Sequence, residues 1–339
     1  MGRMERGDII GNNIKDFLKD GPASINDICK GLKISWATAK SALEDMKEKE
    51  NVKEILSSKI RIFKLSEDPA FYGVPLTNQQ KNDALFLFET IKKEWIKKNE
   101  KPLLKTTLQK IAVDVAKKCD CDIPVVQFHY GLVVPIVASP SLSLTTPKNK
   151  DKIILTVREI IPLHSNHYKD EIDKQYENYG LTLFQEKQKI VSLLKNCDHK
   201  LDKETIKKRF SKFLLICPTD NKDIQIFSLC SSFVDKIHGL ILTNDFENNL
   251  ENVKDSFNIL WDFLTTYLFF KDVSPYVKKG KKEIFEYIKS FQLLSKKSNV
   301  EERINYLDSL TEVTKEIKLP EDEESIAIRR ILNEGAEEE

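Results

Sequence analysis

The sequence predicts a mainly α fold, in which a small N-terminal domain precedes a larger helical domain with a minor strand or extended-loop region. Two observations support this class. Apolar residues recur at helical spacing over long stretches, and only 11 glycines and 12 prolines interrupt the 339 residues. Hydrophobic residues make up 40% of the chain, which is enough for substantial cores, and the length suits two or three domains.

The first 65 residues are expected to form three helices and a hairpin. A helix with an apolar face at Ile9, Ile14 and Leu18 ends at Gly21-Pro22. Ser24 then offers an N-cap, with Asp27 three residues on, for a second helix that ends at Gly31.

Ser35 is the expected N-cap of a third, longer helix. Ala39, Leu43 and Met46 mark its buried face. Two β-like stretches follow at residues 52–56 and 60–65, and residues 57–59 between them indicate a hairpin tip.

A linker is expected at residues 66–77, because two prolines and a glycine occur there without periodicity. The larger domain, residues 78–319, has helical spacing over most of its length. Residues 123–147 are either strands or extended loop, and the fold of residues 220–245 stays open. Stripes in residues 281–297 and 300–317 predict two helices that pack as an antiparallel hairpin. Residues 320–339 form an acidic tail with 8 acidic and 2 basic side chains.

The segment from Leu32 to Met46 resembles the turn and recognition helix of winged helix-turn-helix transcription regulators of archaea and bacteria. The matching positions of that pattern are Ile34, Ser35, Thr38, Ala39, Leu43 and Met46. The resemblance covers residues 8–65, about one fifth of the chain. It implies a sequence-specific DNA-binding regulator whose larger domain dimerises or senses a ligand.

The expected DNA-binding residues lie on the recognition helix and on the hairpin, or wing. Ser35 caps the helix and directs its N-terminus at the nucleic acid. The face opposite the buried stripe is free to enter the major groove, and the Thr38 hydroxyl is expected to reach a phosphate. The wing places two cations near the flanking backbone. The full set is Ser35, Trp36, Ala37, Thr38, Lys40, Ser41, Lys59 and Arg61.

Other interpretations of these residues stay open. Trp36 can pack on the second helix instead of contacting bases, and Lys40 is solvent-exposed under either interpretation. Glu44, Asp45 and Glu48 make the second half of the helix acidic, so only its first two turns suit DNA. The alternative function is a protein-interaction or assembly module, antitoxin-like or scaffold, that uses the winged helix for protein contact.

Two short segments of the larger domain are similar to signatures of Panacea-type antitoxin domains. They are Lys105–Ile111 and, further on, Tyr130-Gly131. No functional residue is carried over from this similarity, because a stable helix with a Lys/Gln solvent face explains the first segment equally well.

Charge gives little evidence about partners, because 54 basic residues stand against 53 acidic ones. Residues 1–65 carry 13 basic and 10 acidic side chains, a net of +3, which is compatible with DNA binding. The expected partners are double-stranded DNA, a second copy of the chain, and an unknown ligand or protein on the larger domain. No signal peptide or membrane span is apparent, so a cytoplasmic location is expected.

No catalytic motif, phosphate-binding loop or complete metal-ligand set is recognisable, so neither an enzyme nor a cofactor is expected. His164 and His167 suit one helix face, but a polar surface is the simpler interpretation. Cys119-Asp120-Cys121 lacks further ligands nearby, and reduced thiols are expected.

Overall fold

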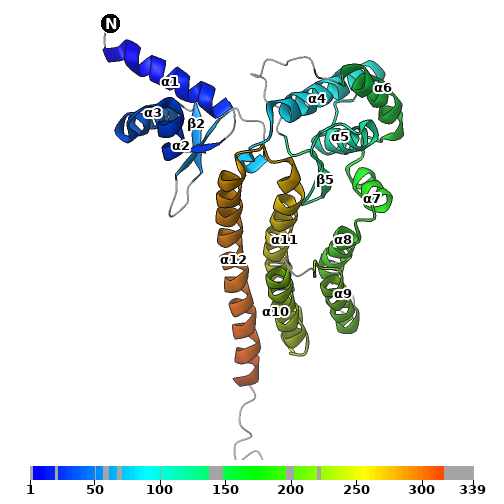
Figure 1. Ribbon diagram of the computed structural model, residues 1–339. Helices are drawn as coiled ribbons and strands as arrows, with labels where there is room; N and C mark the ends of the chain where they lie inside the picture. The colour runs from blue at the N-terminus through cyan, green and yellow to red at the C-terminus, as the bar shows by residue number, and fades with distance from the viewer. Residues whose placement is uncertain are drawn as a thin grey trace, which may run out of the picture. The chain divides into compact units, whose positions relative to one another are not determined.

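The mainly α prediction is confirmed. The computed structural model describes residues 3–19, 22–49, 51–55, 61–66, 71–99, 101–136, 147, 149–195, 202–219 and 223–316. Within these residues the chain forms helices α1 to α12 and two small antiparallel sheets (Figure 1). It divides into two compact units. Unit 1 comprises Met1–Leu181 and Phe263–Ser295, and unit 2 comprises Thr182–Asp262 and Lys296–Glu339.

Unit 1 begins with three helices and a three-stranded antiparallel sheet, which we call the N-terminal body (residues 3–66). The sheet order is β1-β3-β2, with Ala23 opposite Phe63 and Val52 opposite Leu65. The predicted helices and hairpin are present, whereas the two-residue strand β1 was not predicted because it is too short to show periodicity. The elements are α1 (Arg3–Lys19), β1 (Ala23–Ser24), α2 (Ile25–Leu32), α3 (Trp36–Glu48), β2 (Val52–Ile55) and β3 (Ile62–Leu65).

Gly31 lies inside α2 rather than at its end, which corrects the predicted boundary. A Cβ atom at Gly31 would lie 2.3 Å from a ring carbon of Phe17 on α1, so glycine permits the two helices to approach. The helix ends instead at Leu32, and its C-cap Lys33 has left-handed backbone angles (φ 53, ψ 42). Close packing, which is a tertiary property, therefore explains this glycine better than helix termination does.

The predicted linker contains ordered, buried structure. Val74 and Leu76 are fully buried, and Leu76 forms a β-bridge with Val277, just before the long helix α12 (Lys282–Glu316). The backbone N–H of Lys278 donates to the Pro75 carbonyl at 2.8 Å. Lack of periodicity in the sequence carried no information on this burial. The domain boundaries predicted from the sequence stay a prediction.

The rest of unit 1 combines helices with a two-stranded hairpin, β4 (Val126–Phe128) and β5 (Gly131–Val133), within the stretch that the sequence left open. In Figure 1 the helices α4, α5 and α6 lie together. The helices up to α7 are α4 (Asn78–Lys98), α5 (Lys105–Cys119), α6 (Lys150–Ile160) and α7 (Tyr168–Asn178).

Unit 2 is helical and has an aromatic core. The rings of Phe210 and Phe213 each meet Phe257 edge to face, at centroid distances of 5.2 and 5.1 Å. Two long helices, α11 and α12, contribute residues to both units. The helices from α8 onward are α8 (Thr182–Lys195), α9 (Lys203–Leu215), α10 (Ile224–Ile241), α11 (Leu250–Val273) and α12 (Lys282–Glu316). Short 3₁₀ turns occur at Phe71–Gly73, Ile161–Leu163, Glu247–Asn249 and Ser274–Tyr276.

The predicted hairpin of residues 281–297 and 300–317 is wrong, because α12 is one continuous helix of 35 residues. Ser298 and Asn299, taken as a turn, lie exposed on this helix. Neither residue breaks a helix as Pro or Gly does, and each costs only about 0.5 kcal/mol relative to alanine. Ile304 and Leu307 of the second stripe are buried within unit 2, whereas Ile317 and the acidic tail lie outside the described residues.

None of the helices in the described ranges is both long enough and apolar enough to cross a lipid bilayer.

Candidate nucleic-acid interface

The start of α3 is fixed by Ser35, as the sequence predicted. Its side chain accepts a hydrogen bond from the Thr38 backbone N–H at 3.1 Å, and its backbone is extended (φ −67, ψ 154). The Thr38 hydroxyl lies 2.7 Å from the Ser35 hydroxyl, so it already has a partner in the free protein. Both side chains therefore serve first to begin the helix.

The orientation of α3 follows from its buried face. Ala39, Leu43 and Met46 are buried against the other helices of the N-terminal body, which confirms the predicted stripe. Trp36 is 50% exposed, and Ala37 and Ser41 are exposed as well. The first two turns of α3 thus present these side chains outward.

Lys40 links this outer face to an acidic neighbour. Its ammonium lies 5.3 Å from the centroid of the Trp36 ring, within cation–π range, and 3.9 Å from a carboxylate oxygen of Glu44. The Lys40 side chain remains 40% exposed. Exposed ion pairs at this spacing contribute little, so the cation can exchange Glu44 for an external anion at small cost.

Arg61 is bound within the N-terminal body. Its Nε and Nη2 atoms both donate to the carboxylate of Glu54, with the second contact at 3.1 Å. Lys47 also donates to Glu54, at 2.7 Å, and the Glu54 side chain is only 3% exposed. The hydrogen bonds from Arg61, together with those from Lys47, hold the pKa of Glu54 at about 2 despite its burial.

Lys59, the other predicted wing cation, lies outside the described residues. The structure therefore brings together Ser35, Trp36, Thr38 and Lys40 at the start of α3. Arg61 joins them only through Glu44, to which its Nη1 atom is 3.7 Å distant.

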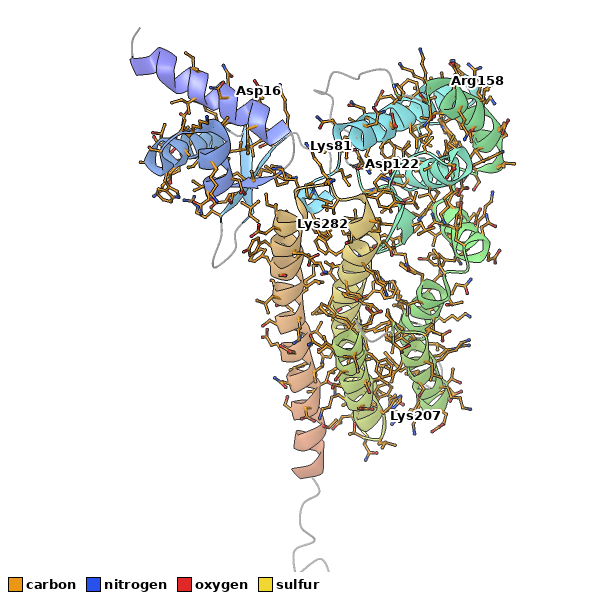
Figure 2. The ribbon with its side chains drawn as sticks, in the orientation of Figure 1. Asp16, Lys81, Asp122, Arg158, Lys207 and Lys282 are labelled. Atoms are coloured by element: carbon orange, nitrogen blue, oxygen red, sulfur yellow. The ribbon has the colours of Figure 1, made fainter. Side chains whose placement is uncertain are left out.

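A run of lysines that the sequence analysis overlooked precedes α12. Lys278, Lys279, Lys281 and Lys282 surround Gly280, and we call residues 277–282 the lysine turn. Backbone contacts with Pro75 and Leu76 fix the start of the turn, and Figure 2 shows Lys282 at the first turn of α12. The run of four lysines in five residues could have identified this turn as a basic segment from the sequence. The sequence could not show that the turn lies beside the N-terminal body.

Lys110, in the segment Lys105–Ile111, is buried in unit 1, which corrects the interpretation of a Lys/Gln solvent face there. The Lys110 ammonium on α5 donates to the Tyr130 carbonyl at 2.6 Å, to the Gln175 side-chain oxygen at 2.7 Å and to the Leu132 carbonyl at 3.4 Å. Burial lowers the pKa of Lys110 to about 7, against the attraction of nearby carboxylates. Lys110 thereby joins α5 to the β4–β5 hairpin and to α7.

His164 does not lie on a polar surface, which corrects that interpretation. Its side chain is 3% exposed and forms hydrogen bonds with Glu171 through Nδ1 and with Asp114 through Nε2, the latter at 3.1 Å. Burial lowers the pKa of His164, but the two carboxylate hydrogen bonds outweigh it and raise the pKa overall. His167, in contrast, is exposed and pairs with Asp170 at 3.1 Å.

Within the described ranges, no group of three or more His, Cys, Asp or Glu side chains is placed to hold a metal ion. Comparison with known proteins adds no assignment: no family model, no curated protein and no solved structure matches the chain.

Proposed function

We propose that the protein is a DNA-binding transcription regulator whose N-terminal body is a winged helix-turn-helix. The observation that carries the proposal is the outward face of α3, where a Ser35-capped N-terminus presents exposed side chains beside Lys40. The order of three helices and a small antiparallel sheet supports the same class. In such modules the N-terminal part of the third helix enters the major groove.

The distribution of charge limits how α3 docks. Glu44, Asp45 and Glu48 are exposed on its second half and would repel phosphates. Only the first two turns, from Trp36 to Ser41, therefore enter the groove in this proposal. Arg61 contributes by holding the sheet against α3 through Glu44 and Glu54, and it contacts phosphate only if it leaves those carboxylates.

The first prediction tests this docking face. Lys40→Glu should weaken binding to duplex DNA by at least about tenfold, because it replaces an attractive charge with a repulsive one at the groove. The exposed position should leave the fold intact, which circular dichroism checks. Lys208→Glu, an exposed lysine on α9, changes the net charge equally and should leave affinity unchanged. Equal affinity of the Lys40 variant and the wild type in a mobility-shift assay would exclude this face.

The second candidate function is a protein-interaction module that uses the same face. The neutralisation of Arg61 by Glu54 and Glu44 favours it, because the wing then offers one cation fewer to a phosphate backbone. Salt dependence separates the two candidates. Each phosphate contact contributes a slope of about −0.9 in a plot of log affinity against log salt concentration. The affinity for an apolar protein surface depends little on the salt concentration. A flat plot would favour the interaction module.

A further inference from the structure

A groove of about 680 Å³ lies in unit 1, between the N-terminal body and the start of α12. Residues from α1, α2, α3, β3 and the lysine turn line it. Its volume is within the range of roughly 300–1,000 Å³ that is usual for ligand sites. The groove adjoins the face proposed above through Trp36, but the remaining lining residues are separate from that face.

Three aromatic rings line the groove: Phe17, Trp36 and Tyr287. Trp36 and Tyr287 are 50% and 40% exposed, which is unusual because burying such large aromatic side chains away from water is strongly favourable. The Lys281 ammonium lies 5.2 Å from the centroid of the Phe17 ring. Flat apolar faces are thus available from both the N-terminal body and α12.

Cations accompany these rings. Lys30, Arg61 and Lys281 line the groove, and Lys279 and Lys282 flank its lining residues in the chain. Across the part of the chain that the structure describes, Lys30, Lys279 and Lys282 make no ion pair. The excess of cations therefore favours an anionic ligand.

Two carboxylates line the groove as well, and they limit what it attracts. Asp27 is occupied by Ser24, whose backbone N–H and hydroxyl donate to it at 3.1 and 2.8 Å. Glu283 is exposed and opposes an anion. Arg61 is held by Glu54 and Glu44, so the available positive charge comes from Lys30 and Lys281 in the lining and from Lys279 and Lys282 in the flanking turn. These four cations outweigh the exposed carboxylate of Glu283.

We propose that this groove binds unpaired nucleotides of a single-stranded DNA. Rings that stack on bases, interleaved with lysines that meet phosphates, are the chemistry of single-strand recognition. A base pair within a duplex cannot present its face to Trp36 or Tyr287, because neighbouring pairs cover it. An acidic peptide would satisfy the lysines but leave the exposed rings without a matching partner. The inference concerns a second ligand and does not require that the duplex proposal be correct.

Intrinsic fluorescence gives a direct readout of the groove. Trp95 and Trp261 are 2% and 4% exposed, so Trp36 is the accessible tryptophan of the three. An oligothymidylate of about ten nucleotides, added to the full-length protein, should quench its emission through stacking. Affinity should fall as salt is raised, because lysine contacts release counterions.

The decisive variant is Tyr287→Ala, which should weaken oligothymidylate binding about tenfold, as loss of one stacked base implies. Tyr306→Ala removes another partly exposed tyrosine of α12 that does not line the groove, and it should bind normally. Lys281→Glu should weaken binding at least as much as Tyr287→Ala. A normal circular dichroism spectrum for each variant would show that the loss of oligothymidylate affinity comes from the groove and not from unfolding.

Several outcomes would overturn the inference: no quenching by the oligonucleotide, equal affinity of Tyr287→Ala and the wild type, or equal binding of thymidine monophosphate and the oligonucleotide. The last result would indicate a small-molecule site. A duplex of the same length separates the two proposals. Tyr287→Ala should retain duplex affinity. A wild-type protein that binds the duplex but not the oligonucleotide would refute this inference alone, and one that binds the oligonucleotide but not the duplex would refute the proposed function alone.

Discussion

At the scale of single residues, Glu54 couples the stability of the N-terminal body to pH. Among the residues that the structure describes, it is the one carboxylate that Arg61 and Lys47 share, and its side chain is nearly inaccessible to water. Its pKa in the folded protein is about 2, against 4.5 for an ordinary glutamate. The folded state therefore binds the proton more weakly than the unfolded state does, so the ion pairs stabilise folding above pH 4.5.

The third prediction follows from that difference. As the pH falls from 4.5 towards 2, the contribution of Glu54 should disappear, up to about 3 kcal/mol at 1.36 kcal/mol per pKa unit. Glu54→Gln should be less stable than the wild type at neutral pH and equally stable near pH 2. Hydrogen exchange of the β2 and β3 amides across this pH range measures the effect locally. If the stability of the β2 and β3 amides depends on pH in the same way in both proteins, Glu54 is not the group responsible.

At the scale of elements, the β4–β5 hairpin depends on a glycine for its contact with α7. Gly131 has φ +100, and a Cβ atom there would lie 2.3 Å from the side-chain oxygen of Gln175. That oxygen accepts hydrogen bonds from Lys110 and from the Leu132 backbone. A methyl group at Gly131 would thus displace the acceptor that joins α5, the hairpin and α7.

Gly180 offers a matched control for the fourth prediction. It also has positive φ, at +60, but nothing lies within 4 Å of its added Cβ atom. Gly180→Ala should therefore cost only the backbone strain, about 1–2 kcal/mol, whereas Gly131→Ala adds the lost Gln175 contacts and should cost at least about 1 kcal/mol more. Chemical denaturation of both variants measures the difference. Equal losses would show that Gln175 moves aside freely.

Also at this scale, the continuity of α12 changes how its apolar stripe is understood. Val300, Ile304 and Leu307 cover the core of unit 2 and are not free to meet a second chain. Leu294, which the first stripe also included, is 69% exposed on the same helix. If the expected homodimer forms through α12, its interface would consequently use side chains other than Ile304 and Leu307.

At the scale of the whole molecule, the proposed regulator is expected to be a homodimer. One winged helix contacts too few base pairs to select a site in a genome, so paired half-sites are the usual solution. The fifth prediction is that light scattering at micromolar concentration gives twice the chain mass of 39.2 kDa. If the interface between the two chains is small, dilution should dissociate the dimer into single chains. A mass of one chain throughout would refute the paired half-site arrangement.

The sequence by itself determined the local features. Hydrogen bonding to the nearest N–H groups makes Ser24 and Ser35 caps wherever a helix follows, and the 3.6-residue period identifies the buried face of α3 without reference to other elements. Both features act over a few residues, which is why they could be predicted.

Only the tertiary structure decided which distant residues meet. Glu54 on β2 pairs with Arg61, which precedes β3, and Lys110 has its acceptors 20 to 65 residues away. The lysine turn reaches the N-terminal body from more than 200 residues further along the chain. Such contacts depend on how elements pack, and burial then sets the pKa of each group that they enclose. Periodicity describes one element at a time and so carries no information about these partners.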